Sequence, residues 1–213
     1  MPKLVYFPVQ GRAQAIRYLL DVKGVQYENE IITGAEWGPR KAANEYGEGV
    51  QLPVWITDDG KVHNQSLAIL KSLAMEHGYA PENASVLFET EWFYSTLFDV
   101  FEKPERRYAL LNDDADEEAQ DKCIALLSTV LDKLEARFAD GRTSVGGTDN
   151  KTAADFYLLA IITSQYENEN GKHERIRTAT KAKLAECANV NRVVDPMKEL
   201  CRATIDALPA SSL

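Results

Sequence analysis

The sequence predicts a small α/β domain followed by a larger all-helical domain. Strand and helix patterns alternate over residues 1–78, and the strand pattern disappears after them. The chain has 213 residues, which exceeds the usual size of one domain. Residues 79–84 form a polar segment with one proline between the two patterns and are expected to be a linker. The predicted domains are therefore residues 1–78 and 85–213.

The first domain is predicted to begin with a strand, a helix and a second strand. Leu4–Phe7 is a β-prone run that ends at Pro8, and apolar residues then recur at helical spacing through residues 11–24. Residues 27–32 form the second strand. Residues 33–49 are rich in glycine and charge, so an irregular segment with one short helix is expected there.

A hairpin and a helix are predicted to complete the first domain. The strand at residues 53–57 leads through a turn at residues 58–61 to a short return strand at residues 62–63. The helix that follows is expected to have Ser66 as its N-cap and to stop at Gly78. The predicted order is βαβαββα, in which a parallel crossover precedes an antiparallel hairpin.

The second domain is predicted to contain only helices. They are expected at residues 85–103, 116–139, 153–166, 174–188 and 193–207. Pro104 breaks or kinks the chain after the first helix. Thr152 is expected to cap the third helix with Asp155 one turn in, and this helix is apolar nearly all round. It should therefore lie at the centre of the domain.

The composition excludes several classes of function. The chain is 45% hydrophobic and 27% charged, as in ordinary globular proteins, and its net charge of −9 argues against a surface for nucleic acid or anionic membranes. A small-molecule partner is expected instead. The first residues do not resemble a signal peptide, and no stretch is long and apolar enough to span a membrane, which predicts a cytoplasmic protein.

The three cysteines are expected to be reduced thiols that serve mainly in packing. Their number is odd, they are far apart, and the chain has neither a CxxC motif nor a Cys/His spacing typical of metal sites. Neither disulfides nor a zinc site is therefore predicted, and the lack of CxxC also argues against dithiol oxidoreductase chemistry.

Five short stretches stand in a recognisable order. They are Val5–Arg12 (VYFPVQGR), Glu36–Lys41 (EWGPRK), Gln51–Val54 (QLPV), Asn64–Ile69 (NQSLAI) and Thr152–Tyr157 (TAADFY). With them, the chain resembles the cytosolic glutathione transferases over essentially its whole length, and most closely the sigma, pi and mu classes. The resemblance implies a thioredoxin-like first domain that binds glutathione, a helical domain that shapes the electrophile site, and a homodimer. It implies conjugation of glutathione to small hydrophobic electrophiles, typical of detoxification.

Tyr6 is the candidate catalytic residue. A thiol with a pKa near 8.5 is only a few per cent ionised at neutral pH, so the site has to favour the thiolate. A shift of about two pKa units corresponds to about 2.7 kcal/mol, which one hydrogen bond to a charged sulfur and local dipoles can supply. Tyr6 offers a hydroxyl at the end of the first strand, whereas Phe7, Pro8, Val9 and Gln10 offer neither hydroxyl nor thiol. Serine-type and cysteine-type chemistry are therefore not expected.

The resemblance also assigns residues to two parts of glutathione. Gln65 and Ser66, at a strand-to-helix junction, are implied to hold the γ-glutamyl end, where free helix N–H groups favour a carboxylate. Leu52 and Pro53 resemble the cis-proline turn of the family, whose backbone bonds the cysteinyl part. Gln51 is expected to lie beside the peptide.

Two further residues are implied to reach the glycine carboxylate of glutathione. They are Trp37, through its indole N–H, and Lys41, through its ammonium group. The segment around them is more acidic and slightly longer than is usual in the family, so Arg40 is an alternative to Lys41.

The first motif and the first long helix supply the remaining candidates. Phe7 and Arg12 are implied at the glutathione site, and Asp99 lies where related enzymes place an aspartate that reaches across the dimer to the glutathione amine. A charge pair between Arg12 and Asp99 would organise both the site and the interface. The electrophile site is expected to use Phe7, Val9 and the helix from Phe101 to Leu111, with Tyr108 as a second hydroxyl.

Two alternatives stay open at this stage. A glutathione-dependent isomerase of the prostaglandin D synthase type would use the same thiolate on a lipid endoperoxide. A non-enzymatic structural protein or ligand carrier would share the fold without the chemistry. Only assays with substrates separate these functions, and the physiological electrophile is not indicated by the residues.

Overall fold

The computed structural model describes residues 1–207 and begins with a four-stranded mixed sheet. The strands lie in the order β2-β1-β3-β4. Strand β1 (Lys3–Tyr6) is parallel to β2 (Glu28–Ile31) and antiparallel to β3 (Val54–Ile56), which pairs with β4 (Val62–His63). The predicted parallel crossover and antiparallel hairpin are both confirmed.

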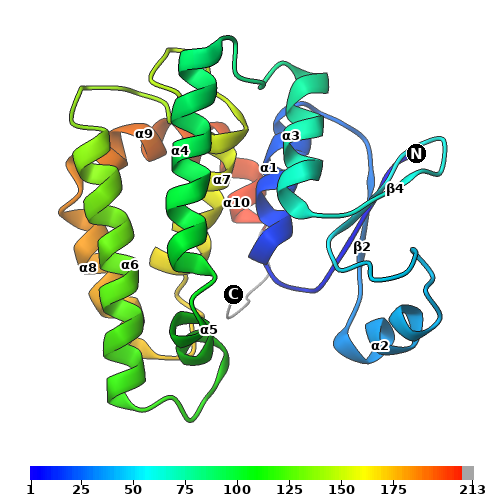
Figure 1. The fold of residues 1–213 in the computed structure, drawn as a ribbon, viewed down its shortest axis with the longest axis horizontal. Helices are drawn as coiled ribbons and strands as arrows, with labels where there is room; N and C mark the ends of the chain where they lie inside the picture. The colour runs from blue at the N-terminus through cyan, green and yellow to red at the C-terminus, as the bar shows by residue number, and fades with distance from the viewer. Residues whose placement is uncertain (208–213) are drawn as a thin grey trace.

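Helices cover both faces of this sheet because successive strand residues point to opposite sides. On one face, Leu4 and Trp55 join the main core with α1 (Gln14–Val22), which follows a 3₁₀ turn at Gly11–Ala13, and with α3 (Ser66–His77). On the other face, residues such as Val5 contact the segment that contains α2. Figure 1 shows α1 and α3 between the sheet and the helical part, with α2 on the far side.

The short helix expected within residues 33–49 is α2 (Gly34–Ala42). Thr33 and Glu36 form a capping box: the Glu36 amide donates to Thr33 Oγ1 at 3.2 Å, and the Thr33 amide donates to Glu36 Oε2 at 2.7 Å. The spacing of these two residues is the sequence signal for this helix start, and α2 carries Trp37.

The rest of the described chain is helical. Its helices are α4 (Ala84–Phe101), α5 (Pro104–Leu111), α6 (Glu117–Arg137), α7 (Ala153–Ile161), the π-helical turn η2 (Ile162–Tyr166), α8 (Glu174–Ala185), α9 (Ala188–Leu200) and α10 (Arg202–Asp206). Pro104 occupies the first turn of α5, where a proline needs no amide hydrogen, and the predicted break there is confirmed. Helix α7 contacts α1, α3, α4 and α9, which fits its predicted central place (Figure 1).

The predicted boundary before the last long helix is wrong. Residue 188 was expected to end one helix and residue 193 to begin the next, but α9 already begins at Ala188. The cause is a cap from another helix: the carboxylate of Glu135 on α6 accepts hydrogen bonds at 3.0 Å from the amides of Asn189 and Val190. A cap so distant in sequence leaves no local signal. The predicted helix over residues 193–207 is also divided, since α9 ends at Leu200 and α10 follows.

The predicted cap of α7 is confirmed. The amide and the hydroxyl of Thr152 donate to Asp155 Oδ2 at 2.7 and 3.0 Å, and the Val145 amide donates to Asp155 Oδ1 at 2.9 Å. The Asp155 carboxylate is buried and therefore joins the helix start to the preceding loop.

One continuous core joins the sheet part and the helical part. The Tyr18 hydroxyl of α1 lies 3.1 Å from Thr163 Oγ1 of η2, and both groups are buried. The division into domains at residues 78 and 85 therefore stays a prediction. The three cysteines are buried and form no disulfide within the described residues. Within residues 1–207, no helix has the length and hydropathy for a membrane span, and no cluster of His, Cys, Asp and Glu has the form of a metal site.

Candidate active site

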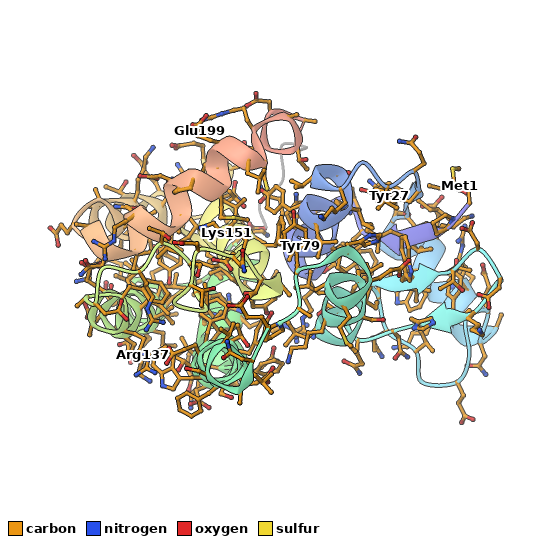
Figure 2. All side chains as sticks on the ribbon, turned by 90° about the horizontal axis from the view of Figure 1, so that it is seen from above. Met1, Tyr27, Tyr79, Arg137, Lys151 and Glu199 are labelled. Carbon is orange, nitrogen blue, oxygen red and sulfur yellow. The ribbon has the colours of Figure 1, made fainter. Side chains whose placement is uncertain are left out.

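A cleft of about 390 Å³ lies between the sheet part and the helical part. Its sheet-side wall includes Tyr6, Arg12, Gln51 and Leu52, and its helical wall comes from the end of α4, from α5, from α7 and from η2. Tyr79, labelled in Figure 2, lies where the two parts meet, and its ring packs at 4.8 Å against that of Phe156. The cleft therefore exists only because both parts are docked together.

Tyr6 stands at the end of β1 with its ring almost buried, at 7% exposure. Its hydroxyl oxygen accepts a hydrogen bond from the Arg12 amide at 3.0 Å. Burial raises the pKa of Tyr6, and the amide bond and the charges of Arg12 and Arg17 offset this only in part. The phenol therefore keeps its proton at neutral pH and is available as a hydrogen-bond donor.

Gly11 allows the chain to approach this phenol closely. Its φ is +41°, and a Cβ atom at this position would lie 2.7 Å from the Tyr6 hydroxyl oxygen. Both the left-handed backbone and the close contact favour glycine. Gly11 was not among the predicted site residues, although it stands in the first motif and its spacing from Tyr6 is visible in the sequence.

A buried guanidinium lies behind the ring of Tyr6. Arg17 has its central carbon 5.8 Å from the ring centroid and donates to the Val9 carbonyl at 3.0 Å and to Gln14 Oε1 at 3.2 Å. Burial lowers the pKa of Arg17, and within residues 1–207 it forms no ion pair. Sequence analysis missed this residue because an arginine in a helix is usually exposed.

Within the chain, Arg12 pairs with Glu102, and the expected pair with Asp99 across a dimer stays a prediction. Arg12 Nη2 lies 2.7 Å from Glu102 Oε1, and both side chains are about half exposed. Glu102 follows the end of α4, where it can reach the β1–α1 turn, whereas Asp99 is exposed and lies outside the cleft lining. Phe7 is also outside this lining, half-buried, with its ring tilted against Tyr6 at 5.6 Å.

The turn before β3 has the expected geometry. The Leu52–Pro53 peptide bond is cis, and Gln51 and Leu52 both line the cleft. The predicted N-cap role of Ser66 is wrong: Gln65 is the N-cap, with φ 69°, and Ser66 is the first residue of α3. No side chain within residues 1–207 caps α3, so no side chain there accepts a hydrogen bond from its first amide groups. Gln65 and Ser66 lie outside the cleft lining.

A second, smaller cavity of about 70 Å³ lies beside α2. Trp37 and Lys41 both line it, and the Trp37 ring stacks on that of Tyr46 with centroids 6.3 Å apart. Arg40 also lines this cavity, but its Nη1 is already paired, at 2.6 Å from Glu30 Oε1 and 2.9 Å from the Tyr46 hydroxyl. Lys41 is exposed and forms no ion pair within the described chain, so it is the cation that is free for a ligand.

Tyr157 and Ser164 are the hydroxyl-bearing residues on the helical wall of the cleft, and the expected role of Tyr108 stays a prediction. Tyr108 is 48% exposed and Val9 is half-buried, and both lie outside the cleft lining, whereas Tyr157 lines the cleft. Burial raises the pKa of Tyr157, and nearby cleft groups such as Arg12 and Arg106 also act on it. The sequence pattern concealed Tyr157 because it stands in an apolar run that indicates a core helix.

Known proteins are similar to this chain over most of its length. The family model "Glutathione S-transferase, N-terminal domain" matches residues 12–75. The chain is 33% identical over 169 residues to the hematopoietic prostaglandin D synthase of Gallus gallus, which covers 76% of this chain and 78% of the relative. It is 31% identical over 204 residues to the class-mu 28 kDa glutathione S-transferase isozyme of Schistosoma japonicum, with 86% and 94% covered.

A solved structure extends the match to the whole fold. The glutathione S-transferase Na-GST-3 of the hookworm Necator americanus, described as monomeric, aligns with a TM-score of 0.80 over 100% of this chain and 99% of its own, at 20% identity. The predicted fold class is confirmed: a thioredoxin-like βαβαββα part precedes an all-helical part. With its two relatives above 30% identity, the chain belongs to the glutathione transferase family.

Proposed function

We propose that this protein conjugates glutathione to small hydrophobic electrophiles, with Tyr6 stabilising the glutathione sulfur as a thiolate. One observation carries the proposal. The Tyr6 hydroxyl lines the cleft, receives a hydrogen bond from the Arg12 amide, and has no acceptor for its own hydrogen within residues 1–207. A buried donor without an acceptor is suited to an anion that arrives with the substrate.

The proposed chemistry needs only a hydrogen-bond donor that keeps its proton at neutral pH. The raised pKa of Tyr6 keeps its hydrogen in place, and the Arg12 amide polarises the hydroxyl further. The glutathione thiol loses its proton to solvent, the sulfur forms a bond to the electrophilic carbon, and the leaving group departs with its bonding electrons. A fall of about two pKa units in the thiol would increase the thiolate fraction at neutral pH more than tenfold.

The proposed binding mode distributes the tripeptide over three elements. The γ-glutamyl carboxylate is held by the open amides at the start of α3, beside Gln65 and Ser66. The backbone of Leu52 pairs with the cysteinyl part. The glycine carboxylate is held by Trp37 and Lys41 at the small cavity beside α2. The sulfur then lies toward Tyr6, and Asp99 of a second copy completes the site at the amine.

An isomerase activity is the second candidate. The Gallus gallus relative is named a prostaglandin D synthase, and it is 33% identical to this chain. The same thiolate would attack one peroxide oxygen of a lipid endoperoxide and break the O–O bond, and the other oxygen would take up a proton. Loss of the proton on the carbon that bears the S–O oxygen would then form a carbonyl and break the S–O bond, so glutathione would be released and not consumed. Assaying glutathione consumption with each substrate class separates the two reactions. We place either reaction in the cytoplasm.

The test of the proposal is Tyr6→Phe. The variant should bind glutathione, while kcat with 1-chloro-2,4-dinitrobenzene should fall about 100-fold because about 2.7 kcal/mol of thiolate stabilisation is lost. The thiol pKa of bound glutathione, followed by ultraviolet absorbance of the thiolate, should return to about 8.5. The control is Tyr27→Phe, which removes a hydroxyl bonded to Asp21 at 3.2 Å and should leave kcat unchanged. Wild-type rates in Tyr6→Phe would refute the role of Tyr6.

A further inference from the structure

Arg106 on α5 carries a positive charge into the helical wall of the cleft. Its Nε and Nη2 donate to the Phe101 carbonyl at 3.1 and 2.6 Å, and its Nη1 donates to Gln165 Oε1 at 2.8 Å. The guanidinium also lies over the Phe101 ring, 4.5 Å from its centroid. These contacts fix the guanidinium in one orientation.

All the hydrogen-bond acceptors of Arg106 are neutral. Within residues 1–207 it forms no ion pair, and three of its five N–H groups are used by the carbonyl and the amide. Arg142, which is also enclosed, differs because it is paired with Glu89 and Asp140. A half-buried guanidinium without a carboxylate has no local compensation for its charge, and burial lowers the pKa of Arg106 accordingly.

The side chains that line the cleft carry a net positive charge, although the protein as a whole is acidic. The chain has a net charge of −9, but the charged residues of the cleft lining are Arg12, Glu102, Arg106 and Arg107. Because Arg12 and Glu102 pair with each other, Arg106 and Arg107 are left unpaired in the described chain. A cleft between low-dielectric walls concentrates the field of such charges on its contents.

We propose that Arg106 binds a carboxylate on the electrophilic substrate, so that the enzyme prefers anionic electrophiles. The inference rests on the proposed function, because it concerns the second substrate of the same cleft. A carboxylate offers acceptor oxygens for the two N–H groups, one on Nη1 and one on Nη2, that these contacts leave unused. The glutathione carboxylates are assigned to α3 and α2, on the sheet side, whereas Arg106 is on the helical wall.

Two aryl halides that differ in one charge test this preference. They are 4-chloro-3,5-dinitrobenzoate and 4-chloro-3,5-dinitrobenzamide. In both reactions the glutathione sulfur bonds to the ring carbon that bears chlorine, and chloride leaves with the electron pair. Arg106→Met should lower the ratio of kcat/KM for the benzoate to that for the benzamide at least tenfold, with KM for glutathione within twofold of wild type. An unchanged ratio, or equal losses for both substrates, would overturn the proposal.

Two further variants separate local binding from general effects. Lys103→Met removes one positive charge beside the cleft from a residue outside its lining, and the ratio should stay within twofold of wild type. Arg106→Lys retains the charge and should retain most of the preference. If Arg106→Met does not fold, Arg106→Lys and the wild-type binding measurements below decide the question.

Measuring binding of compounds that cannot react separates the proposed conjugation activity from the proposed anion site at Arg106. Calorimetry with saturating glutathione should show that 3,5-dinitrobenzoate binds wild type at least tenfold more tightly than 3,5-dinitrobenzamide, with the difference lost in Arg106→Met. If neither halide is conjugated but this difference remains, the proposed function fails and the anion site stands. If conjugation proceeds with no difference in binding, the anion site fails. Competition between dinitrobenzoate and glutathione would show that Arg106 serves glutathione, and would also overturn the proposal.

Discussion

At Tyr6, the proposed chemistry depends on neighbours that carry no reactive group. The positive φ of Gly11 brings the chain back toward β1, and the next amide, that of Arg12, donates to the phenol oxygen at 3.0 Å. Arg17 lies behind the ring without a carboxylate partner in the described chain. The phenol oxygen thus accepts from a backbone donor, the ring lies beside a buried positive charge, and the phenol hydrogen has no acceptor within residues 1–207.

Gly11→Ala tests this arrangement. The new Cβ would lie 2.7 Å from the Tyr6 oxygen in a backbone conformation that L residues rarely adopt, so we expect a loss of about 1–3 kcal/mol in the free energy of unfolding. The displaced hydroxyl should also lower kcat. Urea denaturation and conjugation kinetics measure the two effects. Gly34→Ala is the control, since nothing lies within 4 Å of its Cβ, and a kcat equal to wild type in Gly11→Ala would contradict the argument.

Sequence reasoning proposed Tyr6, which lines the cleft, because the hydroxyl and its flanking motif are adjacent in the chain. It assigned residues 101–111 to the electrophile site without giving Glu102 or Arg106 a role, and it did not identify Tyr157. These three residues come to the cleft from three helical segments that only tertiary packing brings together. Tyr108 and Tyr157 are both in helices near the predicted site. The orientation of each helix about its own axis leaves Tyr108 exposed and places Tyr157 in the cleft lining. Residue type alone does not indicate that orientation.

Among the elements, α4, α6 and the loop before α7 are joined by an ion-pair cluster. Glu89 on α4 pairs with Arg137 on α6 and, at 2.8 Å, with Arg142, which also pairs with Asp140 at 2.7 Å. The Arg142 side chain is only 8% exposed, and its Nη1 also donates to the Val145 carbonyl. The cluster therefore positions the loop that precedes the α7 cap.

This cluster predicts how stability changes with pH. Burial raises the pKa of Glu89, but the hydrogen bonds from Arg137 and Arg142 outweigh it and the net shift is downward. The hydrogen bonds from Arg142 lower the pKa of Asp140 to about 2. A carboxyl with a lowered folded-state pKa stabilises the protein above its unfolded pKa, about 4, and this stabilisation is lost as pH falls through the folded-state value.

Arg142→Met should make the free energy of unfolding depend much less on pH. At pH 7 the variant should lose about 2–3 kcal/mol, because Glu89 keeps only Arg137 and Asp140 loses its partner. At pH 3 the difference from wild type should be smaller, because protonation has begun to weaken the same contacts. Urea unfolding at both pH values measures this. Arg175→Met, which breaks an exposed pair with Asp121, should cost less than about 1 kcal/mol, and an equal effect of Arg142→Met at both pH values would be inconsistent with the cluster's role.

Elements were predictable where their end signals are local. The capping box of Thr152 and Asp155 was read directly from the sequence, and that of Thr33 and Glu36 has the same spacing. The start of α9 was not predictable, since its cap is the carboxylate of Glu135 on another helix. The π-helical turn η2 was likewise expected to be ordinary helix, although it places Gln165 against Arg106 in the cleft.

In the whole molecule, one apolar surface is not covered by any other part of the described chain. Helices α3 and α4 border an apolar cavity of about 320 Å³, and Met75 and Leu87 in its lining are strongly exposed. Phe88, next along α4, is 62% exposed. Asp99, which the resemblance assigns to the glutathione site of a second copy, is exposed on the same helix. Exposed apolar side chains gathered in this way are typical of protein–protein contacts.

We expect a homodimer formed through this surface. Sedimentation equilibrium should give twice the chain mass of 23.8 kDa for wild type, and Phe88→Glu should give the chain mass itself, because a charge would be buried without a partner at the contact. Leu200→Glu, at an exposed apolar residue of α9, should remain a dimer. If Asp99 completes the site of the partner, Phe88→Glu should also weaken glutathione binding. A wild-type mass of 23.8 kDa, the mass of one chain, would rule out the dimer and leave each cleft to act alone.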